Sequence, residues 1–358
     1  MAATLRSVAR ACCRHLGPIW GVSARARGSD IARIRIADEG AREGLFPSCP
    51  YTRTVNEGTT YSGFVAVVGK PNVGKSTLIN SMLGVKIAPI SPKPQTTHKR
   101  VRGIHAEGNR QIVFVDTPGW HETTDALSEY MIRQITEALA EVDLVLWLVD
   151  LRHPPTHEDE RVARALRSLK GQLPIILVGN KADAAKYPES AMQAYAELLP
   201  GLETRMISAQ NERDAKALRD EVLSLLPEGP FFFPPDFAKG DQTPEEWAAE
   251  IVREEAMKRL KEELPYTIAT KTEEFELRPA PTGGGGGMFY IRVNIYVERE
   301  NHKPILIGAG GRKLKEIGAA ARKQLEVFLS RKVYLDLQVK VYPNWRKDPE
   351  ALRELGYH

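Results

Sequence analysis

Residues 69–77 have the types and spacing that suit binding of a phosphate chain. They read Gly-Lys-Pro-Asn-Val-Gly-Lys-Ser-Thr and fit the pattern G-x-x-x-x-G-K-S/T. In such a loop the glycines let backbone N–H groups turn toward phosphates, and the start of the following helix adds positive potential. Lys75 can then reach the terminal phosphates, and the Ser76 hydroxyl can ligate magnesium. The predicted nucleotide-binding residues of this loop are Gly69, Asn72, Val73, Gly74, Lys75, Ser76 and Thr77.

A second group of candidate residues, at positions 116–119, follows the apolar run 112–115. Asp116 stands at the tip of this predicted strand, where its carboxylate can hold the magnesium through water. Gly119 can offer its amide to the third phosphate, so that loss of that phosphate releases the loop that follows. Asp-x-x-Gly alone is a common turn, but its place after a strand and downstream of the phosphate loop favours a nucleotide-sensing role.

A third group, Asn180, Lys181 and Asp183, can choose the base of the nucleotide. The Asp183 carboxylate can accept hydrogen bonds from the N1–H and N2–H2 groups of guanine, whereas adenine presents no such pair of donors. The aliphatic stem of Lys181 can cover the base. A later strand end contributes Ser208 and the Ala209 N–H, which can meet the guanine oxygen. The alternative for positions 180–183 is a polar strand-to-helix turn.

These groups need buried strands and helices to position them. Short apolar runs that suit buried strands are residues 64–68, 112–115, 144–149 and 173–178. Helical spacing is present in residues 78–83 and 158–169. Because strands and helices alternate, we predict an α/β domain with a doubly wound, mostly parallel sheet.

In this order the motifs resemble the small GTPase domains of the translation-factor-related class, over residues 61–226. Residues 94–100 are similar to the first switch of those proteins, in which one threonine senses the third phosphate and magnesium. We take that threonine to be Thr97 and not Thr96. The resemblance implies that GTP is hydrolysed to GDP and phosphate with the help of Lys75, Thr97 and Gly119. It further implies that Mg2+ is held by Ser76, Thr97 and Asp116.

Trp120 follows Gly119, at the position where the best-known small GTPases carry a glutamine that orients the attacking water. An indole cannot hold that water as an amide does. We therefore expect slow intrinsic hydrolysis that needs help from a partner, a backbone group or a cation. In some related GTPases an apolar residue replaces this glutamine, and potassium is used in place of an arginine finger. Asn72 occupies the corresponding place in the phosphate loop. This resemblance implies K+ as a further ion.

A second folding unit begins after residue 227, beyond a proline-bounded stretch, 230–236, that indicates a linker. Residues 243–246 form a capping box that starts a helix. The apolar face of this helix is expected to consist of Trp247, Ile251, Val252, Ala256, Leu260 and Leu264. Strands are expected over residues 266–277, 288–297 and 333–342, with the five glycines 283–287 as a flexible hairpin loop.

Residues 304–318 contain two predicted helices that meet at Gly308-Ala309-Gly310-Gly311. A Gly-x-x-Gly turn lets the backbone of a nucleic acid approach without a β-carbon in the way. From 303 to 332 eight Lys or Arg stand against two Glu, which favours phosphates as the partner, although a solvated helix face is the alternative. The order of elements resembles an α+β type II KH fold. The implied RNA-binding residues are Ile307, Gly308, Gly310, Gly311, Arg312, Lys313, Lys315 and Arg322.

A guanine-nucleotide domain followed directly by a type II KH domain resembles the bacterial Era family of GTPases, over residues 62–358. The resemblance implies a magnesium-dependent GTP hydrolase that binds the 3' end of small-subunit ribosomal RNA and assists biogenesis of the small ribosomal subunit. It also implies a cytoplasmic protein that associates peripherally with the cytoplasmic face of the inner membrane, and we expect a monomer.

Two other functions stay open. One is a non-catalytic RNA-binding assembly factor with GTP as a structural ligand. The other is a GTPase that modifies transfer RNA. The KH module disfavours this function, and so does the absence of any cysteine after Cys49.

The expected organisation is an N-terminal extension (1–60), a GTPase domain (61–228), a linker (229–243), a KH domain (244–342) and a C-terminal tail (343–358). Up to residue 53 there are nine Arg, no Lys and four acidic residues, which is typical of an organellar transit peptide. The alternative is an unstructured or mis-assigned upstream start, which the bacterial-type closing residues favour.

Composition sets the class of protein. The chain has 358 residues, 42% of them apolar and 27% charged, with a formal net charge of +4, as in ordinary globular proteins. No apolar run approaches the roughly 18 residues that a membrane-spanning helix needs.

Overall fold

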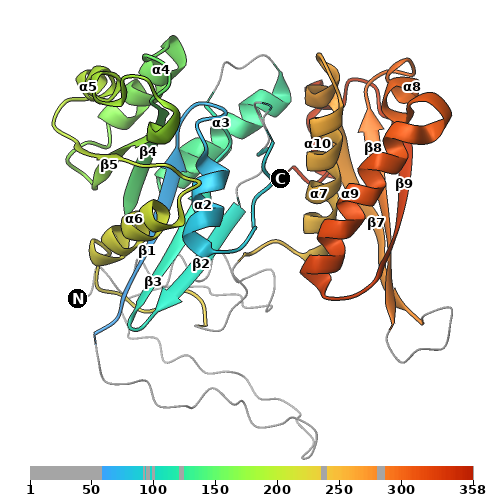
Figure 1. Ribbon diagram of the computed structural model, residues 1–358, viewed down its shortest axis with the longest axis horizontal. Coiled ribbons are helices and arrows are strands. Elements are labelled where there is room, and N and C mark those ends of the chain that lie inside the picture. Colours follow the sequence, from blue (N-terminus) through green and yellow to red (C-terminus); the bar gives the residue numbers. More distant parts are fainter. Residues whose placement is uncertain are drawn as a thin grey trace, which may run out of the picture. The chain divides into compact units, whose positions relative to one another are not determined.

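The computed structural model describes residues 59–91, 93, 97–98, 101–120, 125–234, 240–279 and 287–357. The extension predicted over residues 1–60 lies outside these ranges except for Thr59 and Thr60. Most residues of the predicted first switch (94–100), Thr96 among them, also lie outside these ranges. So do four of the five glycines, 283–286. Two sheets with their helices make up the described part of the chain (Figure 1).

The first sheet has six strands within the described residues, in the order β2-β3-β1-β4-β5-β6. They are β1 (Tyr61–Val68), β2 (Val101–Glu107), β3 (Arg110–Asp116), β4 (Leu144–Asp150), β5 (Ile175–Asn180) and β6 (Glu203–Met206). Only the β2–β3 pair is antiparallel, and the other pairs are parallel. The mostly parallel sheet that the sequence predicts is therefore confirmed.

Helices cover both faces of this sheet. They are α2 (Lys75–Leu83), α3 (Ala126–Leu139), α4 (His157–Arg167), α5 (Pro188–Leu198) and α6 (Glu212–Ser224). Val65 and Val67 of β1 enter one apolar cluster with α2 and α6, whereas Ala66 and Val68 enter a second cluster with α3, α4 and α5. Successive side chains of a strand point to opposite faces, so β1 is buried on both and the sheet is doubly wound.

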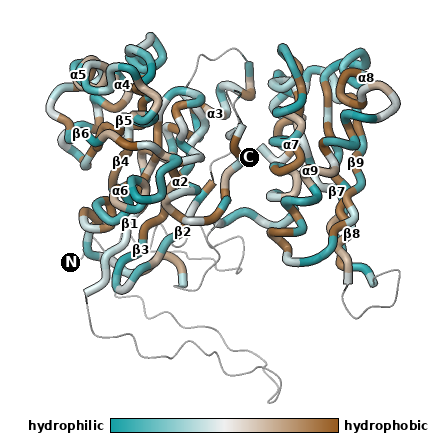
Figure 2. The backbone as a smooth tube through the Cα atoms, in the orientation of Figure 1, coloured by the Kyte–Doolittle hydropathy of each residue, from teal (hydrophilic) through white to brown (hydrophobic). Residues whose placement is uncertain are grey.

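The second sheet has the order β7-β8-β9 and is the KH half of the chain. Its elements are α7 (Pro244–Arg259), β7 (Ala269–Arg278), β8 (Met288–Val297), α8 (His302–Ile307), α9 (Arg312–Leu329), β9 (Val333–Val341) and α10 (Pro349–Glu354). β8 pairs antiparallel with β7 and parallel with β9. α7 and α9 share one apolar cluster with β8, and α9 alternates between polar and apolar residues along its length (Figure 2).

Two predicted boundaries in this half are corrected. α7 ends at Arg259, so Leu260 and Leu264 lie beyond the helix, although both remain in the same apolar cluster. The strand expected from residue 266 begins at Ala269, because Leu264–Thr267 forms a short 3-10 helix that carries a proline in its first turn. The capping box at Thr243 is present as predicted.

Described residues of the predicted linker and tail pack against the domains. Phe232 of the linker lies with its ring centroid 4.5 Å from that of Phe64 in β1, and the Gln111 side chain donates to the Phe233 carbonyl (2.7 Å). In the tail, Trp345 and Tyr357 are buried in a cluster with residues of α3 and with α10. Both segments thus contribute apolar surface to the folded core.

Candidate functional site

A pocket lies where the predicted nucleotide residues come together. Its lining includes most of them: Asn72, Gly74, Lys75, Ser76, Thr77, Thr97, Gly119, Asn180, Lys181, Asp183, Ser208 and Ala209. Gly69, Val73 and Asp116 lie behind this lining and hold it in place through contacts described below. The pocket also has lining residues that sequence reasoning did not single out: Pro71, Pro89, Ile90, Ser91, Arg152, Ala184 and Gln210.

The phosphate loop depends on its two glycines. Gly69 has φ 154° and Gly74 has φ 106°, backbone conformations that other residues rarely adopt. A β-carbon at Gly69 would lie 2.3 Å from the Leu148 carbonyl oxygen, and one at Gly74 would lie 2.4 Å from Nδ2 of Asn180. These close approaches explain why the loop needs glycine at both positions.

Lys75 begins α2 and is almost fully buried. Its Nζ donates to the carbonyl oxygens of Gly69 (3.0 Å) and Lys70 (3.0 Å). Burial lowers the pKa of Lys75 to about 8, while Asp116 and Glu158 act in the opposite direction. The ammonium is thus held inside the loop, where a phosphate anion would restore the stabilisation that it loses on leaving water.

Asp116, at the end of β3, brings the predicted metal ligands together. Its Oδ2 accepts hydrogen bonds from the hydroxyls of Ser76 (2.8 Å) and Thr97 (3.2 Å), which lie 3.1 Å from each other. Its Oδ1 is buried and has no hydrogen-bond partner within the described part of the chain. Burial raises the pKa of Asp116 to about 6, against the hydrogen bonds from Ser76 and Thr97 and the charge of Lys75.

This donor set fits Mg2+, which prefers carboxylate and other oxygen ligands and commonly keeps several waters. Ser76, Thr97 and Asp116 would hold it. When bound, the ion would neutralise charge on the phosphate oxygens. The unpartnered Oδ1 of Asp116 is the observation that favours a cation here, because a buried carboxylate oxygen without a partner is costly.

Asn180 ties the phosphate loop to the base-binding loops. Its Nδ2 donates to the Val73 carbonyl (2.7 Å), and its Oδ1 accepts from the backbone N–H groups of Lys181 (2.7 Å) and Ala209 (2.8 Å). The Ala209 N–H, which sequence reasoning assigns to the guanine oxygen, therefore bonds to Asn180 in this structure. The reason is local: the turn after β6 brings this N–H against the buried amide, and the Ser208 N–H bonds to Asp214 (2.8 Å).

Asp150, at the end of β4, is a positioning residue that sequence reasoning missed. Its carboxylate accepts from Nζ of Lys181 (2.7 Å) and from Nη2 of Arg152 (2.8 Å). Burial would raise its pKa, but the hydrogen bonds from Arg152 and Lys181 outweigh burial and hold the pKa of Asp150 well below its ordinary range. Nζ of Lys181 also donates to the Asn72 carbonyl (2.6 Å), so its stem is fixed beside the pocket. A polar residue ending an apolar strand run, the signal used for Asp116, could have identified Asp150.

Trp120 contributes its backbone to the site and keeps its ring away from it. Its N–H donates to the Gly69 carbonyl (3.2 Å). The ring is partly buried against the apolar cluster beneath α3 and α4, and Trp120 is not among the residues that line the pocket. The indole is therefore not positioned to orient water in this structure.

The Gly-x-x-Gly turn joins α8 to α9 in the KH half. Gly308, Gly310 and Gly311 all have positive φ, and α9 begins at Arg312. Arg312, Lys315 and Arg322 are exposed on α9 at spacings of three and seven residues, which places them on one face. Lys313 and Ile307 are half-buried, and Nζ of Lys313 donates to the Ile305 carbonyl (2.9 Å). Lys313 thus braces the turn as well as adding charge beside it.

Family models match both halves of the chain. One described as "50S ribosome-binding GTPase" matches residues 64–181, and one described as "KH domain" matches residues 263–346. These matches agree with the phosphate-binding pocket in the first half and the Gly-x-x-Gly turn in the second.

The relatives span nearly the whole described chain. This chain is 56% identical over 306 residues to GTPase Era of Deinococcus radiodurans, and the match covers 84% of this chain and 96% of that one. It is 39% identical over 297 residues to GTPase Era of Halothermothrix orenii, covering 83% and 98%. A crystal structure of Era with MgGDPNP and nucleotides 1506–1542 of 16S ribosomal RNA is 41% identical, with a TM-score of 0.77 and coverage of 83% and 99%. The chain belongs to the Era family of GTPases, with a P-loop domain for GTP hydrolysis followed by a KH domain.

Proposed function

We propose that this protein is a GTP-driven switch that binds the 3' end of small-subunit ribosomal RNA through its KH domain and assists biogenesis of the small ribosomal subunit. One observation carries the proposal: Ser76, Thr97 and Asp116 meet at one point beside a guanine-type loop. The similarity to an Era crystallised with MgGDPNP and 16S ribosomal RNA nucleotides supports the choice of RNA.

The residues of the pocket suggest how the switch works. The phosphate loop and Lys75 bind the phosphates, while Thr97 and Gly119 sense the third one. Once that phosphate is cleaved and leaves, Thr97 and Gly119 lose a partner, and the segments that contain them are released. RNA affinity then differs between the two nucleotide states, as any coupling of this kind requires. Equal RNA dissociation constants with a GTP analogue and with GDP would remove this part of the proposal.

A non-catalytic role with GTP as a structural ligand is the alternative that the sequence left open, and membership of a GTPase family disfavours it. The Trp120 ring lies outside the residues that line the pocket, so no side chain at that position orients water and intrinsic hydrolysis is expected to be slow. Phosphate release over several turnovers distinguishes the two candidates. A burst of no more than one phosphate per protein would support the structural role.

Gly311→Asp is expected to weaken RNA binding by about tenfold, a loss of roughly 1.4 kcal/mol, while GTP binding is unchanged. The substitution puts a negative charge at the start of α9, where RNA phosphates are expected. Fluorescence anisotropy with an RNA oligonucleotide of the 3' end measures the change.

Gly311→Asn is the matched control for this substitution. Gly311 has φ 77°, and Asn and Asp tolerate this conformation about equally. Both variants therefore carry the same backbone strain, but only one carries the charge. If the two variants weaken RNA binding equally, strain and not charge is responsible.

Potassium is expected to speed hydrolysis by about tenfold over sodium at equal concentration, because a weakly hydrated cation can stabilise charge at the transferred phosphate. Asn72 has φ 62° and lines the pocket. Asn72→Gly is the control, since glycine adopts this φ without strain and removes the side-chain oxygen. The variant should lose the response to potassium, and an unchanged hydrolysis rate in wild-type protein would show that the ion plays no such part.

Cellular location, membrane association and oligomeric state stay predictions from the family resemblance. Within the residues that the structure describes, no helix combines the length and apolar character needed to cross a bilayer. Fractionation of cells into soluble and membrane-bound protein, with and without high salt, tests peripheral association. Light scattering of the purified protein tests the predicted monomer.

A further inference from the structure

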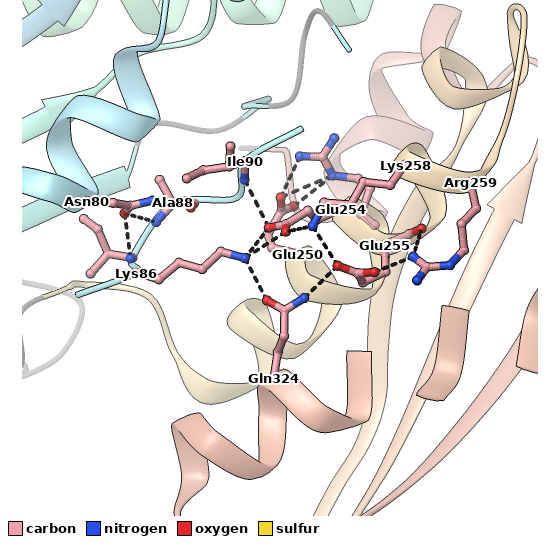
Figure 3. Close-up of polar contacts among 12 residues, drawn as sticks. Asn80, Lys86, Ala88, Ile90, Glu250, Glu254, Glu255, Lys258, Arg259 and Gln324 are labelled. Atoms are coloured by element: carbon pink, nitrogen blue, oxygen red, sulfur yellow. Dashed lines mark hydrogen bonds and ion pairs between the residues drawn. The ribbon is translucent and has the colours of Figure 1, made fainter. Parts of the chain in front are cut away.

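The described residues between α2 and the metal site, 84–91, 93 and 97–98, include several that contact the KH helices, and we call them the connecting segment. Nζ of Lys86 binds the Glu254 carboxylate on α7 (2.6 Å) and the Gln324 side-chain oxygen on α9 (2.7 Å). The Ile90 N–H donates to the same carboxylate (3.1 Å), and the Lys93 ammonium donates to the Leu260 carbonyl. Figure 3 shows Lys86 and Ile90 directed toward Glu254 from the GTPase side.

Both ends of the connecting segment are tied to the nucleotide site. At its start, Oδ1 of Asn80 accepts from the N–H groups of Ile87 (2.8 Å) and Ala88 (3.0 Å) (Figure 3). Asn80 lies one helical turn after Ser76. At its end, the Thr97 hydroxyl lies against Ser76 and Asp116. A change at the metal site therefore acts on a segment whose middle touches the KH domain.

Glu254 is buried by these contacts, with a relative exposure of 1%. Two of its partners, Lys86 and Ile90, come from the GTPase domain, and one, Lys258, comes from its own helix. A buried carboxylate is stable only while its partners remain, because breaking the pair leaves an uncompensated charge. Loss of the connecting segment from α7 would therefore be costly unless α7 or Glu254 also moves.

The contact continues to the RNA-binding helix. The Gln324 amide accepts from Lys86 and donates to Oε1 of Glu255 (2.7 Å), so it links the connecting segment, α7 and α9. α9 is the helix that begins at the Gly-x-x-Gly turn and carries Arg322 two residues before Gln324. The nucleotide site and the predicted RNA face are thus joined by a short chain of side chains.

We propose that Glu254 is a positioning residue that couples the nucleotide state to RNA affinity by holding the connecting segment on α7 when Thr97 is at the metal site. This inference rests on the proposed function, because it assigns the regulation of the same GTP and RNA sites. A nucleotide shifts the equilibrium between two conformations of the protein only through contacts that differ between those conformations. The bonds from Lys86 and Ile90 are those contacts.

The test compares Glu254→Gln with Glu250→Gln. Glutamine keeps the shape of the side chain but has no charge and only one acceptor oxygen. Glu250 also lies on α7 and binds Arg253 of the same helix (2.6 Å), and its described bonds include none to the GTPase domain or to α9. It is therefore a matched control for general damage to the helix.

The measured quantity is the ratio of RNA dissociation constants in GDP and in a non-hydrolysable GTP analogue, for the full chain and the 3'-end oligonucleotide. Glu254→Gln should lower this ratio by about fivefold or more, while Glu250→Gln keeps it. Lys86→Met should lower it from the other side of the contact. The double variant should add nothing to Glu254→Gln alone, because both substitutions break one interaction.

The outcomes separate the inference from the proposed function. If the wild-type ratio is one, or RNA is not bound, the proposed switch fails and the role of Glu254 fails with it. If the wild-type ratio is large and Glu254→Gln keeps it, or if Glu250→Gln lowers it equally, only the inference is overturned. Lys86 is one-third exposed, so Lys86→Met gives the same answer should Glu254→Gln not fold.

Discussion

Asp183→Asn is expected to convert a guanine site into one that prefers xanthine nucleotides, with GTP affinity falling on the order of 10³-fold. Asp183 lines the pocket at the start of the turn after β5, beside the fixed stem of Lys181. A carboxylate accepts from both N–H groups of the guanine edge, whereas an asparagine offers one acceptor and one donor. The amide oxygen can accept from N1–H of xanthine, and the amide NH2 can donate to its C2 carbonyl. With guanine, the amide NH2 would face the N2–H2 group, which is also a donor.

Titration calorimetry with GDP and XDP measures this exchange of preference. Asp214→Asn is the control, because Asp214 holds the Ser208 N–H in the same part of the pocket without a predicted contact to the base. It should weaken both nucleotides by similar factors. An Asp183→Asn variant that loses both nucleotides equally, or neither, would falsify the guanine assignment.

Asp116→Asn is expected to stabilise the nucleotide-free, metal-free protein at pH 7 by about 1–2 kcal/mol while lowering hydrolysis by about 10²-fold or more. The pKa of Asp116 is raised to about 6 by burial. The pKa of this carboxyl in the unfolded chain is about 4. Between about pH 4 and about pH 6, the folded protein therefore binds more protons than the unfolded chain does. Stability from this group is therefore fully present below that window and is lost as the pH rises through it. At pH 7 the charged carboxylate costs stability, and asparagine removes the charge.

Urea unfolding at pH 5 and pH 7, in the presence of a chelator, tests the sign of this effect. The variant should gain on wild type mainly at pH 7, since at pH 5 wild-type Asp116 is largely protonated. Asp220→Asn, half-exposed on α6, is the control and should show little difference between the two pH values. A variant that is less stable than wild type at pH 7 would mean that hydrogen bonds from Ser76 and Thr97 outweigh the cost of the buried charge.

The nucleotide site was largely predictable from the sequence because its chemistry depends on residues at fixed spacing. Lys75 and Ser76 follow a short strand and open a helix, and Asp116 ends a strand, so parallel strands bring them to one edge of the sheet. The bracing by Asn180 was not predictable in detail. Its bonds to Val73 and Ala209 join segments far apart in the chain, and no local pattern specifies them.

The polar face of α7 shows the other limit of sequence reasoning. Its apolar face follows a helical period and was predicted, but Arg253, Glu254 and Glu255 on the remaining surface are buried as well. Charged residues on a helix normally indicate a solvated face. Here Lys86 contacts Glu254, Gln324 of α9 contacts Glu255, and Tyr357 of the C-terminal tail lies near Arg253. These tertiary contacts are not contained in the periodicity of the helix.

The place of Trp120 also has a spectroscopic consequence. Its indole is partly buried one residue after Gly119, in the loop that is expected to move when the third phosphate is lost. Indole emission shifts in wavelength with the polarity around the ring, so the loop carries its own optical reporter. Among the described residues, Trp147, Trp247 and Trp345 are buried and would supply a steadier background. Stopped-flow fluorescence can therefore follow the switch in unlabelled protein.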